Sequence, residues 1–193
     1  MKSRYSDREA RHFFEVYGPF ELPVRQNEIL RPDQAWWDDV ANMYQGPSPA
    51  TGIGCYMFTL GRTAIKPWYI GQTRCQAGFR GEVFTDHKLD HYNSAFAGRR
   101  GPPQMFFFPL ITSNFHDPNW KLSKDRSSTK RLIDWLERTL IGMALARNPD
   151  LQNTKDATFL RTVRLRSIIG AGPLGRPHGE VQIARAALLG LDD

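Results

Sequence analysis

The chain has 193 residues, 40% of them hydrophobic and 12% aromatic, which is enough to bury one core and excludes disorder throughout. Lysine and arginine number 26 against 20 acidic residues, and the net charge of +6 favours polyanionic partners, although ordinary surface charge explains it equally well. The two cysteines, Cys55 and Cys75, have no metal-binding spacing, Met1 leads into charged residues, and no apolar run is long enough to span a bilayer. We therefore expect a cytoplasmic protein with reduced thiols and no membrane partner.

Residues 1–50 are predicted to form a helical N-terminal extension. Ser6 can cap a first helix, which ends at Gly18-Pro19. A second helix is expected from Pro32 to Gly46, and the residues from Gly46 to Pro49 are typical of a linker.

Two short apolar runs follow, Gly54-Cys55-Tyr56 and Tyr69-Ile70-Gly71, and each places a tyrosine two residues from a glycine. Side chains alternate between the faces of a strand, so each glycine shares a face with its tyrosine and leaves room beside the phenol. If the runs pair as antiparallel strands, both hydroxyls can lie on one face with space for a ligand between them. Core packing is the alternative role for either tyrosine taken alone.

The remaining elements are predicted from apolar spacing and turn residues. Residues 76–96 are expected to be helical, 105–111 to form a buried strand and 114–127 to form a polar loop. A strong helix is predicted from Ser128 or Thr129 to Arg147, and residues 156–193 are expected to form a basic helical C-terminal extension.

Glu137 lies on an apolar line of the predicted helix, because apolar residues occur three, four and seven positions from it. An unpaired carboxylate there is costly, and a hard divalent cation with retained waters would offset that cost. The alternative is a glutamate that reaches solvent or pairs with Arg131 or Arg138.

Arg80 and His87 are seven residues apart, so a helix places both on one face. Arg80 can bind phosphate oxygens through its planar guanidinium, and His87 can donate or accept a proton near neutral pH. Arg74 or His91 could take these roles instead. His87 and His91 also have the spacing of half a zinc site, but no further cysteine or histidine cluster accompanies them.

In their order along the chain these features resemble the GIY-YIG nuclease superfamily. The residues that carry the resemblance are Gly54-Cys55-Tyr56, Tyr69-Ile70-Gly71, Arg80, His87, Glu137 and Asn153. They span about half of the chain. The second signature is literal, whereas the first has Cys55 in place of isoleucine, and we expect this small thiol to point away from Tyr56.

The resemblance implies a small α/β domain over residues 51–155, with a three-stranded antiparallel sheet flanked by helices. The implied activity is metal-dependent endonucleolytic hydrolysis of nucleic acid, DNA rather than RNA, of a restriction or mobile-element type. Mg²⁺ or Mn²⁺ would be the cofactor, and double-stranded DNA the partner. A homodimer is left open.

The resemblance also implies roles for individual side chains. Tyr56 would act as the base or orient the water, Tyr69 would hold the phosphate, Arg80 would neutralise it and Glu137 would hold the ion. Lys66 could supply positive charge near Tyr56 or be a solvated turn residue. Asn153 would bond a loop near Glu137 or cap a turn.

Further arginines are candidates for contact with the nucleic-acid backbone. They are Arg74 and, in the C-terminal extension, Arg161, Arg164 and Arg166, for which a solvated helix face is the alternative. The Gly170–Gly175 segment matches a dinucleotide-binding pattern, but too little chain follows it, so we predict a turn.

Two other functions are compatible with the same fold. One is a catalytically weak or inactive nucleic-acid-binding module, which is favoured by a departure from the family pattern. Family members place a tyrosine or histidine one turn after the arginine, whereas Phe84 lies four residues after Arg80. The other is an RNA-directed or toxin-like nuclease, which substrate choice would separate.

Overall fold

The computed structural model describes residues 11–43, 47–113 and 121–153, together with Gly179, Glu180, Ile183 and Ala187. The expectations for the C-terminal extension, including its three arginines and the Gly170–Gly175 segment, lie outside the described residues.

An antiparallel sheet of six strands forms the centre of the molecule. Its strands are β1 (Arg11–Phe14), β2 (Tyr17–Glu21), β5 (Gly54–Leu60), β6 (Lys66–Thr73), β7 (Pro103–Ser113) and β8 (Lys121–Leu122). The order β1-β7-β5-β6 leaves β6 at an edge, while β2 and β8 also pair with β7. The predicted three-stranded antiparallel unit exists as β6-β5-β7, but the predicted sheet was too small because three further strands pair with β7.

The prediction of a first helix before Gly18-Pro19 is wrong, because the described residues of this segment form β1 and the start of β2. Phe13 and Phe14 pair in register with residues of β7, and Tyr17 is buried against the same strand. The register shifts between Tyr17 and Phe20, where Pro19 has no N–H to give to the ladder. Local spacing suggested a helix, but pairing with a distant strand decided the conformation.

A short hairpin and a helix connect these strands to the centre of the sheet. Strands β3 (Val24–Arg25) and β4 (Glu28–Ile29) pair across Gln26 and Asn27, whose positive φ angles of 51° and 62° fit a tight hairpin turn. Helix α1 (Gln34–Asn42) was predicted correctly. It begins after Asp33, whose carboxylate accepts a hydrogen bond from the Trp36 amide at 3.0 Å. The 3₁₀ turn η1 (Pro49–Thr51) then leads into β5.

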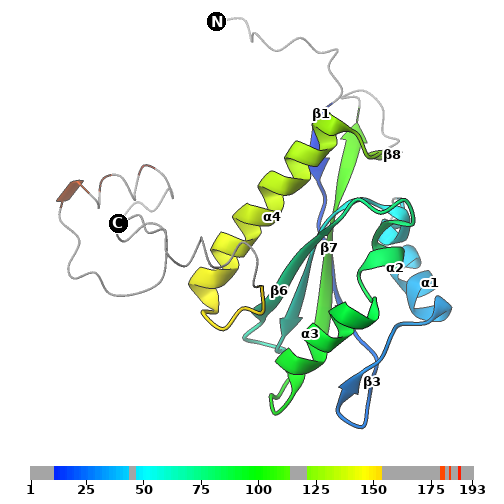
Figure 1. Ribbon diagram of the computed structural model, residues 1–193, viewed down its shortest axis with the longest axis vertical. Helices are drawn as coiled ribbons and strands as arrows, with labels where there is room; N and C mark the ends of the chain where they lie inside the picture. Colours follow the sequence, from blue (N-terminus) through cyan, green and yellow to red (C-terminus); the bar gives the residue numbers. More distant parts are fainter. Residues whose placement is uncertain are drawn as a thin grey trace, which may run out of the picture.

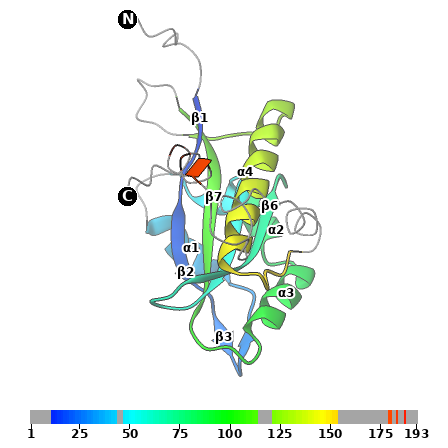
Figure 2. The same ribbon diagram turned by 90° about the vertical axis from the view of Figure 1, so that its left-hand side faces the viewer.

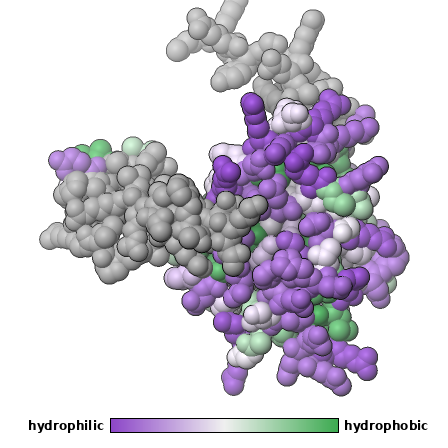
Figure 3. All heavy atoms as spheres, viewed as in Figure 1, coloured by the Kyte–Doolittle hydropathy of each residue, from purple (hydrophilic) through white to green (hydrophobic). Residues whose placement is uncertain are grey.

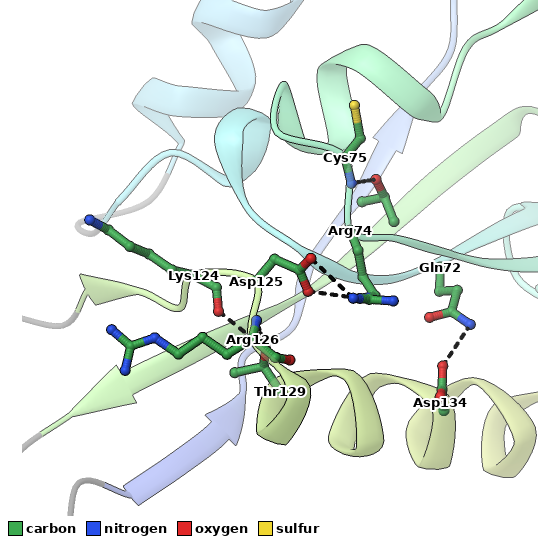
Figure 4. Close-up of polar contacts among 9 residues, drawn as sticks. Gln72, Arg74, Cys75, Lys124, Asp125, Arg126, Thr129 and Asp134 are labelled. Carbon is green, nitrogen blue, oxygen red and sulfur yellow. Dashed lines mark hydrogen bonds and ion pairs between the residues drawn. The ribbon is translucent and has the colours of Figure 1, made fainter.

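The helical region after β6 consists of two helices rather than one, α2 (Gly78–Glu82) and α3 (Asp86–Phe96). The expected buried strand is β7, and the expected long helix is α4 (Ser127–Arg147). Thr129 fixes the start of α4, because its hydroxyl accepts a hydrogen bond from the Arg126 amide at 2.8 Å and donates to the Lys124 carbonyl at 3.1 Å (Figure 4).

The helices form two layers, one on each face of the sheet. Helix α4 covers one face and α1, α2 and α3 cover the other (Figures 1 and 2). Tyr56 and Phe58 pack with Phe79 and Phe107 on the face of α1 to α3, whereas Cys55 packs with Ile133 of α4. Cys55 therefore points away from Tyr56, as predicted, and the strand alternation is that of a sheet buried on both faces.

The side of the molecule seen in Figure 3 is largely hydrophilic, with small separate apolar areas. Among the described residues, no helix is both long enough and apolar enough to cross a membrane.

Candidate functional site

The tyrosines of β5 and β6 lie on one face, as predicted, but the space between them is filled. Tyr56 is directly opposite Gly71, and a Cβ atom at Gly71 would overlap the Cζ and hydroxyl of Tyr56. The Tyr56 ring also stacks on that of Tyr69, with ring centroids 6.2 Å apart and an interplanar angle of 25°. The absent side chain of Gly71 therefore makes room for the phenol of Tyr56 rather than for a ligand.

Gly54 is required by its backbone. Its φ angle is +153°, and a Cβ atom there would overlap the carbonyl oxygen of Phe108 on the neighbouring strand β7. The space expected beside Tyr56 at Gly54 is therefore filled by the backbone of β7.

Tyr56 is fully buried, and its hydroxyl makes no hydrogen bond to any side chain or backbone group of the described part of the chain. Burial raises the pKa of this phenol well above its ordinary value of 10.0. A phenol in this environment is poorly suited to accept a proton from water at neutral pH.

Tyr69 has a different environment. Lys88 of α3 donates a hydrogen bond from Nζ to the Tyr69 hydroxyl at 2.6 Å. The ring of His91 stacks on the Tyr69 ring, with centroids 5.4 Å apart and an interplanar angle of 24°. This contact places a positive charge at hydrogen-bonding distance from the phenol oxygen.

Tyr69 lines a pocket of about 580 Å³ at the open edge of β6, between α3 and α4. Helix α3 contributes His87, Lys88 and His91, and α4 contributes Lys130, Asp134, Glu137, Arg138 and Ile141. The edge of the sheet contributes Tyr69, Gly71 and Gln72, and the segment after α4 contributes Gln152 and Asn153. The pocket therefore combines a phenol, imidazoles, cations and carboxylates, which come from segments far apart in the sequence.

Asp134 and Glu137 are one helical turn apart on α4 and are joined by one amide. Gln72 Nε2 donates to Asp134 Oδ1 at 3.1 Å and to Glu137 Oε2 at 2.8 Å; the first of these bonds is drawn in Figure 4. The other amide atom, Gln72 Oε1, is buried and has no hydrogen-bond partner among the described residues. Two carboxylates thus converge on one amide nitrogen at the edge of the pocket.

This donor set fits a hard divalent cation. Carboxylate and amide oxygens are the ligands that Mg²⁺ takes in proteins, usually together with retained waters. No group of three or more histidine, cysteine, aspartate or glutamate residues is arranged around a common point in the described residues. A cation here would be held by Glu137 and Asp134, with waters completing its coordination.

The opposite wall carries two histidines. The prediction that one helix carries Arg80 and His87 on the same face is wrong, because Arg80 lies on α2 and His87 on α3. His87 instead meets His91, one turn further along α3, with the Nε2 atoms 3.3 Å apart and the ring planes at 76°. Burial, with the neighbouring His87 and Lys88, lowers the pKa of His91 below its usual 6.5.

Two residues predicted to be catalytic lie elsewhere. Arg80 lines a second pocket of about 270 Å³ with Arg31 and Trp37 rather than the pocket of Tyr69. The reason is helical geometry, because Phe79 packs under Tyr56 and the next residue turns away by about 100°. The ammonium of Lys66 lies over the ring of Trp68, 5.2 Å from its centroid.

Arg74, predicted to contact nucleic acid, pairs with Asp125 just before α4. Its Nε and one terminal nitrogen donate to the two carboxylate oxygens at 2.8 and 3.0 Å (Figure 4). This bidentate bond raises the pKa of Arg74 and joins the end of β6 to the start of α4.

Asn153 closes part of the edge of β6. Its side-chain amide donates to the Ile70 carbonyl at 2.7 Å and accepts from the Ile70 amide at 2.9 Å, so one side chain replaces a missing strand neighbour. The expected bond to a loop near Glu137 is instead a bond to the strand that carries Tyr69.

Sequence reasoning missed several pocket residues, which are Gln72, Lys88, Lys130 and Asp134. Asp134 could have been found, because it lies one helical turn before Glu137. Lys88 directly follows His87, but nothing local indicates that it reaches Tyr69.

No family model, curated protein or solved structure matches the chain.

Proposed function

We propose that the pocket between α3 and α4 hydrolyses phosphodiester bonds in nucleic acid, with DNA as the preferred substrate, and that a divalent metal ion is required. The observation that carries this proposal is the placement of the Tyr69–Lys88 pair and the Asp134–Gln72–Glu137 cluster around one pocket. The order of motifs that resembles GIY-YIG nucleases supports the same activity.

In this proposal Tyr69 handles the proton of the attacking water. Its hydroxyl accepts a hydrogen bond from Lys88 at 2.6 Å, so a positive charge lies beside the oxygen that would take up the proton. Tyr56, the base that the resemblance implies, supports Tyr69 through ring stacking instead.

Asp134 and Glu137, which form the carboxylate wall of the pocket, would hold the cation. Bound Mg²⁺ or Mn²⁺ would supply a positive charge that stabilises the phosphoryl oxygens in the transition state. Gln72 orients Asp134 and Glu137 by donating to both of them, and its own position is fixed by β6.

Phosphate groups are attracted by the cations that line the pocket. Lys88, Lys130 and Arg138 come from both walls, and the chain carries a net charge of +6. In this proposal they replace Arg80 in neutralising the phosphate.

The test is incubation of supercoiled plasmid with the protein and Mg²⁺ or Mn²⁺. Nicking or linearisation is expected with wild type, leaving 5′-phosphate and 3′-hydroxyl ends, and no product is expected with Glu137→Ala. Glu28→Ala, which removes an exposed carboxylate on β4, is the matched control and should cleave normally. Cleavage by Glu137→Ala at the wild-type rate would contradict the metal assignment.

A binding module without turnover is the second candidate, and it is favoured by the position of Arg80 outside the Tyr69 pocket and by the full burial of Tyr56. A salt-sensitive mobility shift without any cleavage would support this candidate. A third candidate, an RNA-directed nuclease, predicts cleavage of single-stranded or structured RNA in preference to the plasmid.

A further inference from the structure

The two histidines on the α3 wall have a geometry that the proposed hydrolysis does not use. They lie at positions i and i+4 of one helix, so the backbone of α3 holds both rings on the pocket side. Their Nε2 atoms are 3.3 Å apart, and their ring centroids are 4.5 Å apart.

This separation matches two imidazole ligands of one tetrahedral cation. With a metal–nitrogen distance of about 2.0–2.1 Å, two ligand nitrogens at a tetrahedral angle lie about 3.3 Å apart. The folding of α3 thus already brings the two nitrogens to the separation that one ion requires, and the rings would turn so that both nitrogens face it.

Without a metal, the same contact is a hydrogen bond in which one ring donates its Nε2 proton to the other. An ion can replace that proton. The donating ring changes from the Nε2–H to the Nδ1–H tautomer, so both Nε2 lone pairs face the ion and no net proton is released.

The donor chemistry separates this pair from the carboxylate wall. Imidazole nitrogen suits Zn²⁺, Co²⁺, Ni²⁺ and Cu²⁺, whereas the oxygen donors of Asp134 and Glu137 suit Mg²⁺ or Mn²⁺. We propose that His87 and His91 form a second, nitrogen-based site for a borderline divalent cation such as Zn²⁺. Two protein ligands leave the other positions of the ion open toward a pocket of about 580 Å³, where water or an anion can complete its coordination.

The proposal does not depend on nuclease activity, and its test contains no nucleic acid. Zn²⁺ is titrated calorimetrically into the untagged full-length protein in the presence of excess Mg²⁺. Cu²⁺ then serves as a spectroscopic probe, because its electron paramagnetic resonance spectrum reports the number of bound nitrogens. We expect one saturable Zn²⁺ site that Mg²⁺ does not displace, and two nitrogen ligands on Cu²⁺.

The test variants are His87→Asn and His91→Asn on α3. The control is His12→Asn on β1, which lies at the other end of the molecule from α3 (Figure 1). Each test variant should weaken Zn²⁺ binding at least about tenfold, equivalent to about 1.4 kcal/mol, and reduce the Cu²⁺ signal to one nitrogen. His87 is exposed, so His87→Asn is expected to fold normally, and circular dichroism checks this.

Unchanged Zn²⁺ affinity in both test variants would overturn the proposal, as would an equal loss in the His12→Asn control. A Cu²⁺ spectrum with fewer than two nitrogens in the wild-type protein would overturn it as well.

Discussion

Strands β5 and β6 carry the same combination of a tyrosine and a glycine two residues apart, and both tyrosines belong to one core cluster, yet their hydroxyls have different surroundings. Tyr56 on β5 is 0% exposed and its hydroxyl has no hydrogen-bond partner in the described part of the chain. Tyr69 on β6 is 8% exposed, bonds Lys88 and lines the pocket.

The difference follows from the position of each strand in the sheet. Strand β5 lies between β6 and β7, so its side chains are enclosed by neighbours on both sides and by Phe79 of α2. Strand β6 is an edge strand, and its side chains can reach the space between two helices. Equal sequence patterns can therefore give one tyrosine enclosed in the core and one that lines a pocket.

The strongest challenge to this comparison is the pair of variants Tyr69→Phe and Tyr56→Phe. Loss of the Tyr69 hydroxyl should lower single-turnover plasmid cleavage by about two to four orders of magnitude, because it removes the proposed proton acceptor. Tyr56→Phe should remain close to the wild-type rate. A large loss in Tyr56→Phe with little loss in Tyr69→Phe would reverse our assignment.

Substitution of Lys88 sharpens the same comparison. Lys88→Met keeps most of the aliphatic side chain and removes the charge beside the Tyr69 hydroxyl. A hydrogen bond to a charged group contributes about 1.5–3 kcal/mol, so cleavage should slow about 10- to 100-fold. Lys124→Met, which removes an exposed cation near the start of α4, is the control. Equal rates in the two variants would show that Lys88 does not act on Tyr69.

Gly71→Ala tests whether the space at Gly71 belongs to Tyr56. The new methyl group would overlap the Tyr56 phenol, so the free energy of unfolding should fall by about 1–3 kcal/mol in urea denaturation. Gly142→Ala is the matched control, because a Cβ there meets nothing within 4 Å and alanine favours a helix. An unchanged stability of Gly71→Ala would mean that the phenol can move aside at no cost.

The smallest effect concerns Arg74, which is paired with Asp125. Its pairing leaves little charge to contact a phosphate, so Arg74→Gln should hardly change the salt dependence of DNA binding. In an Asp125→Asn background the same substitution should reduce the log-log slope by about 0.9, the value for one duplex phosphate contact. Fluorescence anisotropy over a range of salt concentrations measures both slopes. A full reduction by Arg74→Gln alone would show that the ion pair opens on binding.

The sequence determined much of the fold on its own. Apolar runs, glycines and prolines predicted β5, β6, β7, α1 and α4, because these elements have a clear period and clear ends. It also placed Tyr69, His87, Glu137 and Asn153 among the functional candidates, and all four line the same pocket. The resemblance to GIY-YIG nucleases identified these residues, and it rests on their order along the chain.

The tertiary structure decided the rest. Residues 11–21 form strands because β7 offers them partners about 90 residues away, and no local pattern contains that information. Arg80 lies outside the Tyr69 pocket because Phe79 occupies the buried side of α2. Lys88 lies inside it because α3 packs beside β6, where Lys88 bonds the Tyr69 hydroxyl. The exposure and charge around each phenol depend on such long-range packing, so only the folded molecule shows which tyrosine lines the pocket.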